Sequence, residues 1–273
     1  MEGERRRIST FEPEDAADYT IIHFSLKEVQ TQLTRFVDPT PFVPGTKTDR
    51  DKRCEEILAI QAMGLKKRLE HTGCKCAVVG ISGGLDSTLA LLVTMRAFDL
   101  LHIPREQILA VTMPGFGTTD RTYENAVHLI QKLGADLREI SICDAVHVHF
   151  HDIRQDPHMH DVTYENSQAR ERTQILMDIA NMYNGMVIGT GDMSELALGW
   201  ATYNGDHMSM YGVNASVPKT LVRHLVRYFA DTCGDEGLSE VLFDILDTPV
   251  SPELLPPTEG RISQKTEDIV GPY

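Results

Sequence analysis

The sequence predicts an α/β fold: a doubly wound parallel sheet flanked by helices. Short apolar, β-rich runs alternate with helical segments, and a glycine-rich loop joins the first run to the first helix. The expected strands are 76–81, 108–113, 137–142 and 186–190, and the expected helices between them are 87–101, 120–133 and 165–183. Short buried strands in this alternation form parallel sheets that are covered on both faces through right-handed crossovers.

A long helix is expected ahead of the sheet, beginning near Asp49 and ending at Gly73. Its apolar residues recur at helical spacing and include Ile57, Ile60, Met63 or Gly64, Leu65 and Leu69. Residues 1–48 contain two proline clusters and little periodicity, which indicates an extended arm and a linker.

The chain after Ala230 is polar and proline-rich, so a loop-rich tail is expected there. The domain organisation that follows is an arm and linker over 1–48, a main domain over 49–230 and a tail over 231–273. The abrupt end of the tail suggests a truncated domain.

The composition is that of a folded globular protein. The chain has 273 residues, 40 acidic against 26 basic, a formal net charge of -14 and a hydrophobic content of 41%. The negative charge disfavours nucleic-acid binding. No apolar stretch approaches the roughly 18 residues of a membrane helix, and no hydrophobic segment follows the charged start to form a signal peptide. We therefore expect a cytoplasmic protein with no nucleic-acid or membrane partner, and with its five cysteines reduced.

The loop after the first strand carries the strongest chemical signal. Two adjacent glycines let the backbone approach a ligand, and the helix end that follows attracts anions, so a phosphate fits there. Asp86 would repel that phosphate unless a cation lay between them, which points to Mg²⁺. No Gly-Lys-Ser/Thr follows, so the loop is not a Walker A sequence. A tight turn with a helix cap is the alternative interpretation. The residues concerned are Gly80, Ile81, Ser82, Gly83, Gly84, Leu85, Asp86 and Ser87.

The segment from Ser82 to Ser87 resembles the loop of the ATP pyrophosphatase (PP-loop) superfamily, whose members split ATP into AMP and pyrophosphate. Two later segments, 164–173 and 189–206, followed by 217–220, are similar to NAD synthetase, particularly the synthetase domain of the glutamine-dependent type. This resemblance covers roughly residues 50 to 230. It implies an adenine nucleotide alpha hydrolase-like fold and a carbon-nitrogen ligase that amidates deamido-NAD to NAD through an NAD-adenylate intermediate.

The resemblance also implies roles for particular residues. Asp86, Glu195 and Lys219 would be catalytic, with Asp86 and Glu195 as Mg²⁺ ligands. ATP, the co-substrate, would contact the loop residues together with Thr190 and Lys219. Deamido-NAD would contact Asn166, Arg170, Glu195, Trp200, Ala201, Thr202 and Tyr203.

Plainer interpretations of four of these residues remain open. Glu195 could simply stabilise a helix start through the dipole, and Trp200 could be a core residue. Lys219 and Arg170 could be exposed surface charges. Arg172 is two residues from Arg170, so the two side chains should diverge on a helix.

Five histidines invite a metal-site interpretation, which the sequence does not favour. The first three could share a face of a strand, but the same stretch can form a short helix that would scatter them. Residues 152–163 are better interpreted as a mobile loop gated by substrate. The histidines are His147, His149, His151, His158 and His160.

The expected partners are ATP, deamido-NAD and ammonia, with a glutaminase domain outside this chain or free ammonia as the nitrogen source. The resemblance also implies a homodimer or a higher homo-oligomer. Two rival functions stay open. One is another PP-loop enzyme such as a GMP-synthetase-like ligase, and the other is a non-catalytic module that binds adenine nucleotides.

Overall fold

The computed structural model describes residues 20, 22–32, 34–38, 40–248 and 254–255. The chain divides into two units, 1–39 and 40–273. The described residues of the first unit contain no helix or strand. All elements discussed below belong to the second unit.

The second unit is built on a five-stranded parallel sheet with the order β3-β2-β1-β4-β5. The strands are β1 (Cys76–Gly80), β2 (Ile108–Thr112), β3 (Asp136–Glu139), β4 (Gly185–Gly189) and β5 (Tyr211–Gly212). The expected α/β class and the four expected strands are confirmed, to within a few residues at their ends. β5 was not expected, since its two residues are too short to show a pattern.

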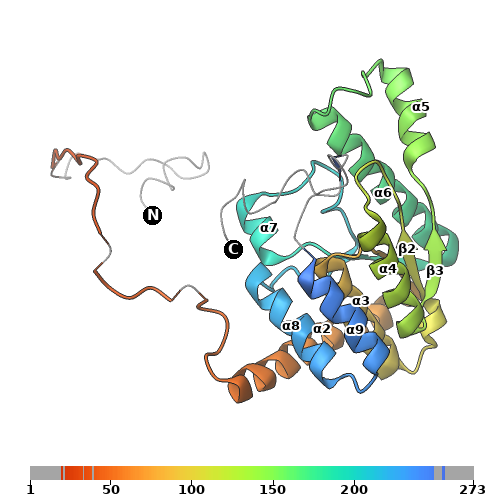
Figure 1. Ribbon diagram of the computed structural model, residues 1–273, viewed down its shortest axis with the longest axis horizontal. Helices are drawn as coiled ribbons and strands as arrows, with labels where there is room; N and C mark the ends of the chain where they lie inside the picture. Colours follow the sequence, from red (N-terminus) through yellow and green to blue (C-terminus); the bar gives the residue numbers. More distant parts are fainter. Residues whose placement is uncertain (1–19, 21, 33, 39, 249–253, 256–273) are drawn as a thin grey trace. The chain divides into compact units, whose positions relative to one another are not determined.

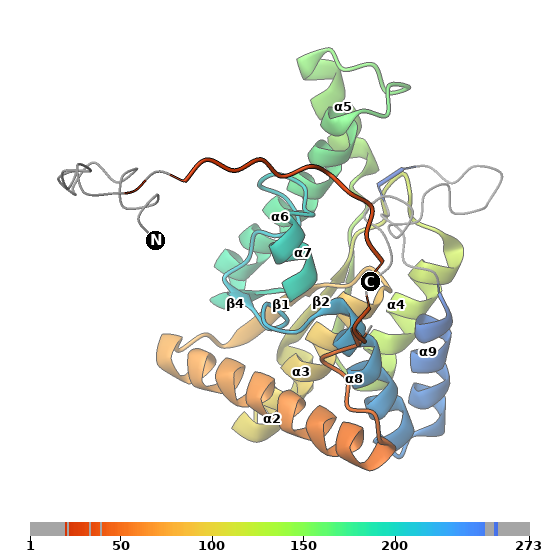
Figure 2. The same cartoon turned by 90° about the vertical axis from the view of Figure 1, so that its left-hand side faces the viewer.

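Helices cover both faces of the sheet, as a doubly wound fold requires (Figure 1, Figure 2). Alternate residues of β1 explain why. Ala77 and Val79 pack in a core with the helices of one face, whereas Cys76 and Val78 pack in a second core with the other face. The first face carries α2 (Lys47–Thr72), α3 (Leu85–Leu101), α4 (Asp120–Leu133), α8 (Lys219–Thr232) and α9 (Glu236–Asp247). The second carries α5 (Cys143–Ile153) and α6 (Val162–Tyr183).

The expected helix near Asp49 is α2, but only part of the apolar row inferred for it is buried. Ile60 and Met63 are 72% and 52% exposed. Leu65 and Leu69 are buried as expected, and the other buried residues are Cys54, Leu58, Gln61 and Ala62. Both sets of residues have helical spacing, so only the packing against α3 and α8 selects between them. The expected stop is confirmed, because Gly73 adopts a left-handed conformation with φ 68° and its N–H donates to Leu69.

The expectation of a loop-rich tail after Ala230 is wrong for residues 236–247, which form α9. Leu238, Leu242 and Ile245 recur at helical spacing and are buried. The helix is also fastened to α4, because the Arg121 guanidinium donates to both carboxylate oxygens of Asp244. The prolines that suggested a loop begin at residue 249, beyond this helix. They lie outside the described residues.

Residues 147–151 of the histidine-rich stretch are helical, which separates His149 from His147 and His151, since only the last two lie on one side of the helix. His147, His149 and His151 lie on α5 and are exposed. His147 packs its ring against Phe116, with ring centroids 4.9 Å apart. Among the helices that the structure describes, none combines the length and the apolar content of a membrane span.

The packing predicts two classes of cysteine. Burial raises the pKa of Cys54 to about 11 and also raises the pKa of Cys76, so neither forms the reactive thiolate readily. Cys74, Cys143 and Cys233 are partly exposed. Iodoacetamide at about pH 8 should therefore label these three in the folded chain and label Cys54 and Cys76 only after unfolding. Peptide mass spectrometry checks this order, and labelling of Cys54 as fast as Cys143 would contradict the packing.

Candidate active site at the carboxyl edge of the sheet

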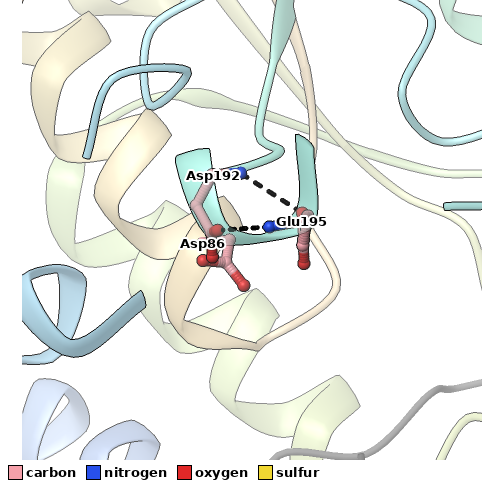
Figure 3. Close-up of side chains that lie close together, drawn as sticks. All are labelled: Asp86, Asp192 and Glu195. Atoms are coloured by element: carbon pink, nitrogen blue, oxygen red, sulfur yellow. Dashed lines mark hydrogen bonds between the residues drawn. The ribbon is translucent and has the colours of Figure 1, made fainter. Parts of the chain in front are cut away.

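The candidate site lies where the strand order changes direction. From β1 the chain winds outward to β2 and β3, then returns to the other side of β1 as β4. Ligands of open α/β sheets bind at such a switch point, beyond the carboxyl ends of the strands. Asp86 follows β1, while Asp192 and Glu195 follow β4. Each of the three offers an oxygen atom, and these atoms lie within 4.8 Å of one another (Figure 3).

The loop after β1 is held rigidly. Gly83 has φ 86°, and a Cβ atom there would overlap the main-chain carbonyl of Thr122 in the first turn of α4. Only glycine fits both the conformation and the space. The hydroxyl of Ser82 accepts a hydrogen bond from Gly84 N at 3.2 Å, and the hydroxyl of Ser87 donates to the Gly84 carbonyl at 3.1 Å. The loop therefore presents Asp86, in the first turn of α3, from a fixed backbone.

The loop after β4 leads into the short helix α7 (Met193–Leu198). Asp192 caps this helix by accepting from Glu195 N at 3.0 Å, and Glu195 Oε2 accepts in return from Asp192 N at 3.2 Å. Glu195 therefore stabilises the start of a helix, which is the plainer interpretation given to it from the sequence. Its second oxygen, Oε1, accepts a hydrogen bond from Lys219 Nζ at 3.1 Å.

Lys219 lies among the three carboxylates. Its Nζ is 2.5 Å from Asp86 Oδ2, 2.7 Å from Asp192 Oδ2 and 3.1 Å from Glu195 Oε1. The side chain is 7% exposed, so Lys219 is not an ordinary surface lysine. It enters the site at the start of α8, where its main-chain N–H donates to Ser194 Oγ at 3.1 Å.

The electrostatics of this cluster disfavour the ionisation of its carboxyl groups. Burial raises the pKa of Asp86 to about 7, against the opposing effect of Lys219, and burial also raises the pKa of Glu195. Burial lowers the pKa of Lys219, but the three carboxylates outweigh it and raise that pKa above its usual value. The ammonium group therefore stays charged, whereas the raised pKa values of Asp86 and Glu195 mean that ionising all three carboxyl groups is unfavourable without a further cation.

The residues present fit a magnesium ion. Oxygen ligands from one or two carboxylates are what Mg²⁺ prefers beside phosphate groups. Asp86 Oδ1 is also buried and makes no hydrogen bond to any described residue, so it is a ready ligand atom. Of the described residues, only these three acidic side chains form a group close enough to hold a metal ion.

A second group of expected residues gathers between α6 and the loop after α7. Arg170 Nε donates to the Tyr203 carbonyl at 3.1 Å, and Thr173 Oγ1 donates to the Gly205 carbonyl at 2.8 Å. Asn166 lies one turn before Arg170, on the same side of α6. The contact of Arg170 joins α6 to the loop that carries Trp200, Ala201, Thr202 and Tyr203, with Asn166 one turn away on the helix.

Trp200 is half-buried, and its main-chain N–H donates to the Glu195 carbonyl at 2.9 Å. This loop therefore continues directly from the carboxylate cluster. Tyr203 is exposed. The expected divergence of the two arginines is confirmed, because Arg172 Nε donates instead to the Met113 carbonyl at the end of β2.

The sequence interpretation missed Asp192, which belongs to the carboxylate cluster, and Asn214, which lies next to the cluster. Asp192 could have been suspected from the spacing Asp-x-x-Glu, which is a capping-box pattern at a strand-to-helix junction. Asn214 is buried and donates to the main-chain carbonyls of Asp86 and Thr190. No local pattern marks it.

A family model described as NAD synthase matches residues 57–254. The glutamine-dependent NAD(+) synthetase of Mycobacterium leprae is 45% identical over 247 residues, 88% of this chain and 36% of that protein. The glutamine-dependent NAD(+) synthetase of Mycobacterium tuberculosis is 42% identical over 289 aligned residues, 100% of this chain and 42% of that protein. The chain thus spans 36% to 42% of the length of these curated relatives.

Solved structures agree with the fold. The glutamine-dependent NAD+ synthetase from Acinetobacter baumannii in complex with ADP aligns with a TM-score of 0.64 at 28% identity, over 73% of this chain and 36% of that chain. The NMN synthetase from Francisella tularensis aligns with a TM-score of 0.67 over 81% of this chain and 82% of that chain. Its 24% identity shows the fold alone. The adenine nucleotide alpha hydrolase-like fold expected from the sequence is confirmed.

Gly83→Ala should disrupt the loop after β1, because the new methyl group meets a main-chain carbonyl that cannot move without shifting α4. We expect a loss of about 1 to 3 kcal/mol in unfolding free energy and at least a tenfold weaker affinity for ATP, measured by thermal unfolding and calorimetry.

Gly134→Ala is the matched control. Gly134 also has a left-handed conformation, with φ 74°, but open space surrounds its Cβ position at the end of α4. Gly134→Ala should lose as much unfolding free energy as Gly83→Ala or less, and it should keep its affinity for ATP. Equal affinity losses in the two variants would show that backbone strain, not the position of the loop, is responsible.

Proposed function

This chain belongs to the NAD synthase family, and from that we propose that it amidates deamido-NAD to NAD while ATP is cleaved to AMP and pyrophosphate. The observation that carries the proposal is the cluster of three carboxylates and one lysine at the switch point of the sheet, beside the rigid loop after β1. The identity of 42% to 45% to curated glutamine-dependent NAD(+) synthetases supports the same reaction.

The chemistry explains why such a site needs charge more than a nucleophile. A nicotinate carboxylate is a poor electrophile toward ammonia. One of its oxygens therefore attacks the α-phosphorus of ATP, forming an acyl adenylate as the bond to the leaving pyrophosphate breaks. Ammonia then attacks the acyl carbon, AMP leaves with the oxygen, and the nitrogen loses a proton. Holding two anionic partners together and neutralising phosphate charge are tasks of positioning and electrostatics.

Asp86 and Glu195 would hold Mg²⁺, with Asp192 as the third carboxylate of the cluster. The ion would supply positive charge to the phosphate oxygens of ATP. Ser82, Gly83 and Gly84 would present main-chain N–H groups to the phosphates, and Thr190 would contact ATP from the loop after β4. The fixed backbone of the loop after β1 supports this role, because preorganised donors need no rearrangement during the reaction.

Lys219 would change partners as ATP binds. Its ammonium group contacts the same three carboxylates that would hold the metal ion, and two cations at one place repel each other. A lysine side chain is long and flexible. Lys219 would therefore turn from the carboxylates to an ATP phosphate, which makes it both a resting counter-ion and a ligand of the nucleotide.

Deamido-NAD would bind between α6 and the loop after α7. Asn166 and Arg170 would contact the substrate from the helix. The stretch from Trp200 to Tyr203 would lie against the nicotinate ring, where an aromatic face can stack. The direct continuation of this loop from Glu195 supports the placement, because the residues proposed for deamido-NAD then follow the residue proposed for the metal ion of ATP on one segment.

Ammonia would come from a glutaminase domain outside this chain, as the names of its curated relatives suggest, or free from solution. We further propose that the protein is a homodimer or a higher homo-oligomer, and that it acts in the cytoplasm.

Pyrophosphate release from ATP with Mg²⁺, deamido-NAD and ammonium tests the reaction. We expect release to depend on deamido-NAD, and NAD to form from ammonium but not from glutamine with this chain alone. Release that instead requires xanthylate would identify a GMP-synthetase-like ligase. Binding of ATP with no release under any of these conditions would indicate a binding module.

Asp86→Asn should reduce pyrophosphate formation by at least about a hundredfold, because the variant loses a metal ligand. The variant should remain folded, since it also removes a buried charge whose raised pKa reflects an unfavourable environment. Its thermal unfolding midpoint should match or exceed that of the wild type. Full turnover in this variant would exclude Asp86 as a metal ligand.

Lys219→Met should bind Mn²⁺, a probe for Mg²⁺, at least about tenfold more tightly without nucleotide, because no ammonium group competes for the carboxylates. The same variant should bind ATP more weakly. Titration followed by electron paramagnetic resonance measures both effects. Lys67→Met, on the exposed side of α2, is the control and should change neither. Unchanged Mn²⁺ affinity in Lys219→Met would contradict the exchange of partners.

A further inference from the structure

Asn214 joins the two segments that carry the carboxylates. It lies between β5 and α8 and is fully buried. Its side-chain Nδ2 donates to the Asp86 carbonyl at 2.9 Å and to the Thr190 carbonyl at 3.0 Å. Asp86 opens α3, and Thr190 lies two residues before Asp192. One amide group therefore bridges both sides of the switch point.

The orientation of this amide is determined by its neighbours. Two carbonyl oxygens face Nδ2, and carbonyl oxygens can only accept. On the other side, Gln61 Nε2 donates to Asn214 Oδ1 at 3.2 Å and to the Val213 carbonyl at 2.8 Å. Gln61 is buried in the middle of α2 and reaches the site only through Asn214 and Val213. Asn214 is thus fixed from behind by a helix that carries no expected site residue.

The two segments need such a bridge because the sheet no longer holds them. The last residue pair between β1 and β4 is Val79 with Ile188. Beyond it, the described residues 82–87 and 190–195 share no backbone hydrogen bond. Lys219 also contacts both segments, but its contacts are ionic and are the ones expected to break when a metal ion binds. The amide of Asn214 bears no charge, so its hydrogen bonds to the Asp86 and Thr190 carbonyls should persist when a metal ion binds.

We propose that Asn214 is a positioning residue that sets the separation of Asp86 from Asp192 and Glu195, and that Gln61 fixes Asn214 for this task. The inference rests on the proposed function only in naming a metal-bound nucleotide as what the carboxylates receive. Residues behind metal ligands orient them, and their loss typically weakens metal binding by about 10- to 100-fold.

Two near-isosteric variants test this inference. Asn214→Leu removes the bridge, and Gln61→Met removes its support while leaving Asn214 in place. Calorimetry with Mn²⁺, alone and with ATP, should show a loss of about 10- to 100-fold for Asn214→Leu and a smaller loss for Gln61→Met. The double variant should be little worse than Asn214→Leu, because that single variant has already lost the contact between Gln61 and Asn214.

Leu69→Ala is the control for stability. Leu69 is buried near the end of α2 that faces the amino edge of the sheet, away from the site. Its truncation should lower the unfolding midpoint and leave the Mn²⁺ affinity within about twofold of the wild type, since a cavity there moves no ligand. The inference would be overturned if folded Asn214→Leu bound Mn²⁺ as tightly as the wild type. It would also be overturned if the affinity loss of the double variant equalled the sum of the losses of Asn214→Leu and Gln61→Met.

Amide hydrogen exchange separates this inference from the proposed function. Exchange in 82–87 and 190–195 should be faster in Asn214→Leu and in Gln61→Met without any ligand, but not in Leu69→Ala. A wild-type chain that binds neither Mn²⁺ nor ATP would refute the proposed function, yet the exchange comparison would still decide the role of Asn214. Unchanged exchange in both segments would overturn it.

Discussion

One buried ammonium group allows three carboxylates to lie side by side. Asp86, Asp192 and Glu195 repel one another, and burial removes the water that would weaken this repulsion. Lys219 contacts all three, which makes the cluster possible, but it balances only part of their charge. Asp86 also keeps a buried oxygen without a hydrogen-bond partner among the described residues, which fits the proposed binding of a divalent cation and of phosphate groups.

The fold assembles this centre from three helix starts. Asp86 opens α3 after β1, Asp192 and Glu195 cap α7 after β4, and Lys219 opens α8. Because β1 and β4 are neighbouring parallel strands, their carboxyl ends meet at the same edge of the sheet. The order of strands, rather than any single segment, therefore brings the charges together.

Ionic contacts and neutral hydrogen bonds have different tasks in this centre. The ionic contacts of Lys219 are the ones that we propose to be exchanged when a metal ion binds. The hydrogen bonds of Asn214 to two main-chain carbonyls do not involve charge, and in this proposal they hold the two segments during the exchange. The proposed binding of a metal ion, a nucleotide and an acyl group in turn would need both kinds of contact, since positioning would supply much of the rate.

The sequence by itself determined the strand and helix alternation, the rigid loop around Gly83, and Asp86, Glu195 and Lys219 as candidates. Each of these depends on a local pattern or on a family resemblance carried by contiguous residues. Only the tertiary structure decided which row of α2 is buried, that 236–247 is a helix of the core, and that Asp192 and Asn214 belong to the centre. Gln61 and Asn214 are 153 residues apart in the chain. A polar side chain finds such a partner only when the elements have packed, because burial then favours hydrogen bonds between polar groups that lie far apart in the chain.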